Sequence, residues 1–222
     1  KLLKIKDHAF IQSGLTELNI PDHVVIEDGT ALFYSCKSLK SVHLPDTLTS
    51  IPAQMFQFSN ELETVNIPST VTSIGQHAFN SVAVKAFVLP DLTSIGDKAF
   101  ENLAEGSGIY VSNKSTADLF NAENYSTNKS FLAVTNDGSF ASDAEFKLGA
   151  FTEPVKTGYK FGGWYESANF SGNAVTAAPT AGHTYYAKWE EKAEKTAPAA
   201  PTLKDRTYSS ITLNTIEGAQ YR

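Results

Sequence analysis

The sequence has only one cysteine, Cys36, among its 222 residues. A single thiol excludes an intrachain disulfide and any metal site built from several thiolates, so packing alone has to hold the fold. No run of apolar residues approaches the roughly 18 residues of a membrane helix, so we expect no membrane-spanning segment. Residues 1–20 also lack the basic start and the apolar stretch of a signal peptide, and we expect any export signal or wall anchor to lie elsewhere.

The chain has no excess of basic residues. Lys and Arg number 18 against 24 Asp and Glu, which gives a formal net charge of -6, and both signs are spread along the whole length. Because binding to phosphates needs a basic face, this balance argues against nucleic acid as a partner.

Sequence motifs of catalysis are missing as well. There is no H-E-x-x-H, G-x-S-x-G, P-loop or G-x-G-x-x-G pattern, and His23, His43 and His183 have no partner His at the spacing of metal ligands. His8 and His77 both belong to His-Ala-Phe segments at the same position of a repeat, which favours a structural role for them. We therefore expect no enzyme activity, no cofactor and no metal site.

The first half of the chain is instead organised by a repeat of about 23 residues. Phe recurs at this interval, at Phe10, Phe33, Phe56, Phe79 and Phe100. Pro follows the same interval, at Pro21, Pro45, Pro68 and Pro90. Self-similarity at a period of 20 to 50 residues is typical of a solenoid, in which stacked units bury the apolar edges that a single unit leaves exposed. We expect each repeated Phe to lie in the core.

Each Pro is preceded by a short strand whose apolar residues alternate, which predicts one buried face. The apolar pairs are Leu18 and Ile20, Val42 and Leu44, Val65 and Ile67, and Phe87 and Leu89. Another apolar residue stands three positions earlier, at Leu15, Leu39, Leu62 and Val84, which completes the L-x-x-L-x-L strand of a leucine-rich repeat.

The segment from Val65 to Phe79, which ends in Ile-Gly-Gln-His-Ala-Phe, resembles the BspA-type leucine-rich repeats of bacterial surface proteins. The resemblance covers residues 1–128 and implies an extracellular protein, at the cell surface or secreted. We expect Ile109–Val111 to be the last strand of the solenoid. A short helix over Ser115–Phe120, capped by Ser or Thr, would then close its end.

Aromatic residues become denser after residue 129, in Thr157–Tyr165 and in Tyr185–Trp189. These segments resemble the Listeria-Bacteroides repeat, the B repeat of internalins, and the resemblance implies a small ubiquitin-like β-grasp domain over residues 129–191. Small domains depend on large side chains for their core, so we favour core packing of these rings over a ligand-binding aromatic patch. The predicted fold class is mainly β with short helical turns, a leucine-rich-repeat solenoid followed by the β-grasp domain.

The C-terminal part begins with a predicted Ala- and Pro-rich linker over residues 192–201. Residues 202–222 resemble the first strands of a fibronectin type III domain, with an alternating strand over Ser209–Leu213. A complete sandwich of this type needs about 100 residues, so we expect this truncated piece to be held against a neighbouring part of the chain.

The best candidate for function is the outward face of the solenoid strands, because alternation places their intervening side chains outside. The predicted binding face consists of Glu17, Asn19, Ser41, His43, Thr64, Asn66, Ala86, Val88 and Tyr110. We expect it to bind a host or bacterial surface protein or glycan, as in an adhesin. Two alternatives stay open: the repeats are passive spacers of a large secreted protein, or they flank a catalytic domain encoded beyond either end.

Overall fold

A computed structural model of the chain describes residues 3–27, 29–138, 140, 151–193, 203–206 and 211–213. Residues Lys1–Glu190 form one compact unit and residues Glu191–Arg222 form a second. Over the described residues the fold is mainly β, with a single four-residue helix, α1 (Lys114–Ala117). Of the predicted fold class, the mainly β character with short helical turns is confirmed.

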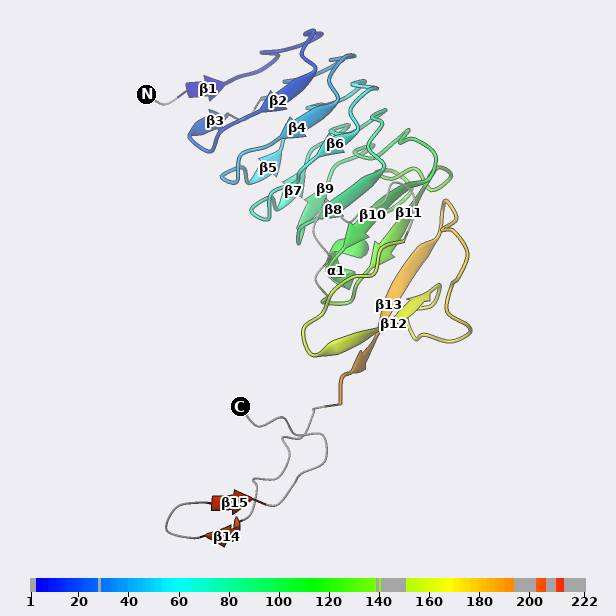
Figure 1. Ribbon diagram of the computed structural model, residues 1–222. Coiled ribbons are helices and arrows are strands. Elements are labelled where there is room, and N and C mark those ends of the chain that lie inside the picture. Colours follow the sequence, from blue (N-terminus) through cyan, green and yellow to red (C-terminus); the bar gives the residue numbers. More distant parts are fainter. Residues whose placement is uncertain are drawn as a thin grey trace. The chain divides into compact units, whose positions relative to one another are not determined.

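Stacked coils of short parallel strands make up most of the first unit (Figure 1). One sheet contains β2 (Glu17–Asn19), β4 (Ser41–His43) and β6 (Thr64–Val65) in that order. A second sheet contains β5 (Ser50–Ile51), β7 (Ser73–Ile74) and β9 (Ser94–Ile95), and β1 (Leu3–Ile5) pairs with β3 (Val24–Ile26). Since all these pairs are parallel and join successive repeats, the predicted solenoid of stacked coils is confirmed.

The alternating apolar residues of the repeats face the interior, as their period of two predicts. Val42, Leu44 and Leu62 are buried, and Leu18 and Val65 are partly buried and pack against the same core cluster. Apolar burial between successive coils is the main stabilising term of such a fold.

The repeated Phe residues form one ladder through the coils. Phe33, Phe56, Phe79 and Phe100 are fully buried, and neighbouring rings lie 5.7, 5.7 and 5.6 Å apart between centroids. Their planes are inclined by at most 18°, so the rings stack. Phe10 stacks on Phe33 at 5.3 Å but is 36% exposed, since it belongs to the first coil. The prediction that the repeated Phe residues form the core is confirmed from Phe33 onward.

The turn that carries each Phe has an unusual backbone. Two residues per turn, four positions apart, have positive φ, as in Gln54 and Phe58 or His77 and Ser81. This conformation turns peptide N–H groups toward the next coil, so that Phe56 N donates to Ala78 O and Phe79 N donates to Ala99 O, both at 2.9 Å. Hydrogen bonds between coils offset the strain of these residues, which is of the order of 1 kcal/mol each.

The parallel ladder extends beyond the predicted last strand. β8 (Ala86–Leu89) pairs with β10 (Ser107–Val111), and β10 pairs in turn with β11 (Ser130–Val134). Phe120 stands 5.6 Å from Phe100 and continues the Phe ladder, while Leu132 and Val134 enter the same core. The prediction that the strand at 109–111 is the last was wrong, because the regular Phe and Pro interval ends before the stacking does.

The short helix expected over Ser115–Phe120 is present as Lys114–Ala117, so it begins one residue earlier and ends three residues earlier than predicted. Its N-cap is Asn113, whose side-chain oxygen accepts a hydrogen bond from Thr116 N at 2.8 Å. Asn is as good a cap as Ser or Thr, because its short side chain reaches the same free N–H group.

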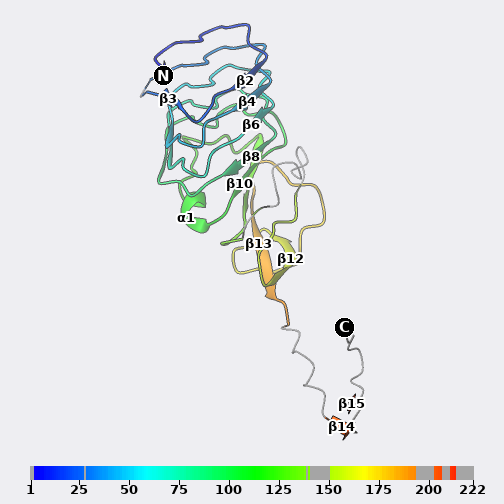
Figure 2. The same cartoon turned by 60° about the vertical axis from the view of Figure 1, so that its left-hand side comes forward.

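A second core cluster covers one face of the last strands. β13 (Thr184–Glu191) pairs in parallel with β11 and lies between β11 and β12 (Tyr159–Tyr165), so that β8, β10, β11, β13 and β12 form one five-stranded sheet (Figure 2). Trp164, Tyr185 and Phe131 are buried there with Tyr110, away from the Phe ladder. The sheet therefore crosses the predicted boundary between residues 128 and 129, and that boundary and the β-grasp fold stay predictions.

In the second unit, β14 (Leu203–Arg206) and β15 (Ile211–Leu213) pair in antiparallel orientation. β15 lies within the strand that alternation predicts over residues 209–213. Most of the predicted linker at 192–201 and the rest of residues 202–222 lie outside the described residues.

Candidate functional site

The outward side chains of β2, β4 and β6 stand in register. Glu17 pairs with Ser41, and Ser41 pairs with Thr64, which makes one row across the three strands. Asn19 and His43 are paired in the neighbouring row. Because parallel strands lie about 4.8 Å apart, each row presents polar groups at nearly constant spacing. We call these side chains, together with Asn66, the open strand face.

The open strand face carries a groove. It has a volume of about 420 Å³ and is lined by Glu17, Leu18, Asn19, Ser41, Val42 and His43. Glu17, Asn19 and His43 are exposed, and Ser41 is half-buried. The groove thus combines a carboxylate, an amide, a hydroxyl and an imidazole within two neighbouring strands. Leu18 and Val42 also line it, although sequence alternation assigns both of them to the core.

The other end of the predicted face is not open. Tyr110, predicted to be an exposed residue of the binding face, is 0% exposed, so the prediction that it is open to a partner was wrong. It does lie on the outer side of β10, but its ring packs edge-on against Phe131 and Phe140 at 5.8 and 5.7 Å. Ala86 packs against the same cluster, and Val88 is half-buried. The later part of the chain covers this end of the sheet. The periodicity of the repeats does not predict this cover.

Asn66 has a structural role within the open strand face. Its side-chain oxygen accepts a hydrogen bond from Leu44 N at 2.6 Å, and its amide nitrogen donates to Leu44 O at 3.2 Å. Both side-chain groups therefore continue the strand ladder where the backbone bridge between β4 and β6 ends. Asn66 is half-buried and offers less to a partner than Glu17 or His43.

The titratable groups with large pKa shifts lie away from the groove. Burial raises the pKa of Tyr110 well above its ordinary value and raises the pKa of Tyr125 to about 12, so both phenols are neutral at physiological pH. A hydrogen bond from Lys4 lowers the pKa of the exposed Glu27. Over the described part of the chain no group of three or more His, Cys, Asp and Glu side chains is arranged to hold a metal ion.

Two family matches divide the first unit. Residues 1–117 match the BspA type leucine-rich repeat region, in six copies. Residues 119–188 match the Listeria-Bacteroides repeat domain. Both resemblances drawn from the sequence are confirmed, and the fibronectin type III-like segment stays a prediction.

Among solved structures, the chain is similar to a leucine-rich repeat protein from Bacteroides ovatus. The identity is 23%, the match covers 60% of this chain and 37% of that chain, and the TM-score is 0.43. It is also similar to a leucine rich cell surface protein from Faecalibacterium prausnitzii, at 25% identity over 49% of this chain and 42% of that chain, with a TM-score of 0.32. The chain thus spans less than half the length of these two structures. No curated protein sequence matches it.

None of the described helices is long and apolar enough to span a membrane.

Proposed function

Because the chain belongs to the BspA type leucine-rich repeat family, we propose that it is a non-catalytic protein-interaction module of a bacterial cell-surface or secreted protein. Its role is adhesion, to a host protein, another bacterium or a surface glycan. The coils hold the binding groups rigidly, and the partner meets them without any chemical step.

The observation that carries this proposal is the grooved open strand face. Glu17, Asn19 and His43 are exposed on strands whose inward residues pack in the core, so the backbone that carries them is fixed before a partner arrives. A preorganised backbone loses little conformational entropy on binding, which favours affinity. Binding at such a face needs no loop to close over the ligand.

The size of the open strand face limits what it binds by itself. A standard protein interface uses about 20 to 30 residues on each side. The three strands β2, β4 and β6 supply far fewer outward side chains than that. We therefore propose that the face contacts a small epitope or a glycan segment, or forms one part of a larger surface.

We also propose that residues 129–191 form a β-grasp domain, that residues 192–201 are a linker after it, and that residues 202–222 begin a fibronectin type III-like domain. The match of residues 119–188 to the Listeria-Bacteroides repeat supports the first of these assignments. In this arrangement the C-terminal modules space the repeats from the cell wall.

A binding screen tests the proposed function. The full 222-residue chain is applied to arrays of extracellular matrix proteins and glycans, and to whole bacterial and host cells. We expect saturable binding to at least one of them. Replacement of Glu17, Asn19 and His43 together by Ala should reduce that binding by about tenfold or more, because these side chains line the groove.

The matched control replaces Gln76 and Asp97 by Ala, since both are exposed but lie in the turns and not on the strand face. This variant should bind like the unchanged chain. Loss of binding in both variants, or in neither, would contradict the assignment of the open strand face. A chain that binds nothing in the whole screen would favour the passive-spacer alternative.

A further inference from the structure

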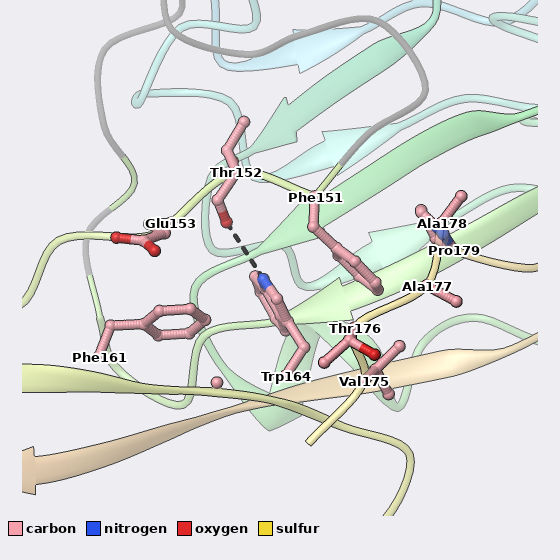
Figure 3. Close-up of a pocket in the computed structure, with 11 residues that line it drawn as sticks. Phe151, Thr152, Glu153, Phe161, Trp164, Val175, Thr176, Ala177, Ala178 and Pro179 are labelled. Atoms are coloured by element: carbon pink, nitrogen blue, oxygen red, sulfur yellow. Dashed lines mark hydrogen bonds between the residues drawn. The ribbon is translucent and has the colours of Figure 1, made fainter. Parts of the chain in front are cut away.

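The part of the chain after residue 150 contains a pocket that the open strand face does not explain. Its volume is about 380 Å³, within the usual range for ligand sites. It lies between the segment Phe151–Glu153, residues 161–164 of β12 and the loop Val175–Pro179 (Figure 3).

Aromatic rings form the floor and one wall of the pocket. Trp164 is buried, and its Nε1 donates to Thr152 O at 3.2 Å, which fixes the indole ring. Phe151 stacks on it at 5.2 Å, and Phe161 meets it edge-on at 5.7 Å. Phe151 and Phe161 are only half-buried, so part of each ring faces the pocket.

The Glu and Thr side chains of the lining each have an oxygen that can accept a hydrogen bond. Glu153 is exposed at its rim, and among the described residues it makes no ion pair. Thr152 Oγ1 is buried in the wall and has no hydrogen-bond partner among the described residues, although buried polar groups are ordinarily paired. No Lys, Arg or His belongs to the described lining. The pocket therefore offers negative charge and π-electron density without a cation of its own.

Neighbouring aromatic rings of β12 and β13, unlike those of the pocket, have a lysine of the chain close to them. Lys156 Nζ lies 4.4 Å from the ring centre of Tyr159 and 5.9 Å from that of Trp189, and Lys188 Nζ lies 5.7 Å from the ring centre of Tyr165. These distances are typical of cation–π contacts. Lysines of the chain thus lie close to these neighbouring rings, whereas the described lining of the pocket has no cation, and its rings are open to a cation of a partner.

We propose that this pocket binds a lysine side chain of a partner protein. The ammonium group lies against Glu153 and the ring of Phe161, where charge and π-electron density both attract it. The alkyl stem packs on the apolar lining formed by Phe151, Val175 and Pro179. The site is separate from the open strand face, so it adds a second contact and does not depend on the first.

Short capped peptides test this proposal. The full chain is titrated with a capped Gly-Lys-Gly peptide, and backbone and indole N–H signals are followed by ¹H–¹⁵N NMR. We expect weak binding, with a Kd on the order of 1 mM, and shifts at Trp164, Thr152 and Glu153. The same peptide acetylated on Nζ should bind about tenfold more weakly, because acetylation removes the charge.

Two variants make the test specific. Glu153→Gln should weaken binding of the lysine peptide by about fivefold, whereas Glu166→Gln, at an exposed carboxylate beside His183, should not. The signals of the remaining residues report that each variant is folded. Equal binding of the acetylated peptide, no effect of Glu153→Gln, or tighter binding of a matched Gly-Arg-Gly peptide would each overturn the proposal.

Discussion

The coils of the solenoid and the cluster around Trp164 both bury aromatic rings, but they pack them differently. In the coils, successive Phe rings are nearly parallel, with planes inclined by 9 to 18° from Phe10 to Phe100. In the second cluster most rings meet edge-on, as at Phe131 and Tyr185, where the planes are inclined by 79°. In the coils, the same stacked contact between two Phe rings recurs from one repeat to the next. In the second cluster, each contact between rings has its own geometry and occurs once.

The two cores lie on opposite faces of the five-stranded sheet, because alternate residues of β10 and β11 belong to each of them. The outward residues Glu17, Ser41 and Thr64 of the sheet β2–β4–β6 are polar, whereas Tyr110 and Phe131 on β10 and β11 are aromatic. Gly108 lies between the rings of Tyr110 and Phe131, and a Cβ at this position would stand 2.6 Å from Phe131 and 2.7 Å from Tyr110. The absence of a side chain at Gly108 lets the edge-on pair form, and the outer face of the five-stranded sheet becomes a core.

The largest effect we predict concerns the stacked core. Phe79→Ala should lower the free energy of unfolding by about 3 to 5 kcal/mol, because it leaves a cavity between Phe56 and Phe100. Phe10→Ala is the control and should cost clearly less, since Phe10 is 36% exposed and stacks on Phe33 alone. Urea denaturation followed by circular dichroism measures both. Equal losses would mean that position along the ladder does not matter.

The junction of the two cores should be the next most sensitive point. Gly182 has φ of +80°, its N–H donates to Ser130 O at 2.7 Å, and a Cβ there would overlap Thr127 O. Gly182→Ala should therefore cost about 2 to 4 kcal/mol, from backbone strain plus steric overlap. Gly172→Ala has a similar φ of +87° with no atom close to its Cβ, and should show the strain alone. Thermal unfolding of both variants separates the two terms, and equal losses would exclude a tight junction.

Within the open strand face, Asn66 and His43 should differ in how much each contributes to the free energy of unfolding. Asn66→Ala removes two hydrogen bonds to Leu44 and should cost about 1 to 2 kcal/mol. His43→Ala should change stability by less than about 0.5 kcal/mol, because His43 is exposed. A difference in the urea midpoint between the two variants checks this. If His43→Ala is the more destabilising, the faces of these strands have been assigned incorrectly.

The smallest effect that we predict is a loss of folding stability at alkaline pH. Burial raises the pKa of Tyr125 to about 12, whereas an unfolded tyrosine titrates near pH 10. The folded state therefore keeps a proton that the unfolded state releases, and stability is complete below about pH 10 and falls as pH rises toward about 12. This group should contribute a loss of about 1 kcal/mol between about pH 9 and pH 11.

Tyr125→Phe isolates this contribution, because it leaves the raised pKa of the buried Tyr110 in place. The difference in unfolding free energy between the unchanged chain and this variant should shrink from about pH 9 to pH 11. A constant difference would show that Tyr125 does not titrate during unfolding.

Much of the solenoid could be predicted because its contacts repeat at a fixed interval. The positions of Phe33, Phe56 and Phe79 follow from the interval alone, and the strands before each Pro follow from alternation. Both are local properties of the sequence, and the structure confirms them.

The features that escaped prediction depend on contacts between distant segments. Nothing near Tyr110 indicates that Phe131 and Phe140 cover it, and nothing near Asn66 indicates that its amide bonds to Leu44. The strand β11 was missed because the Pro interval ends at Pro90, and Phe120 was assigned to the closing helix although it continues the Phe ladder. Extending the Phe interval beyond Phe100 would have placed Phe120 in the ladder, whereas the cover over Tyr110 needs the three-dimensional structure.

The position of β13 between β11 and β12 has a mechanical consequence. The chain leaves the first unit at the end of β13, so tension on the residues after it is applied to this strand first. A force along the strand would load its hydrogen bonds to both neighbours together, in shear, instead of opening them one after another.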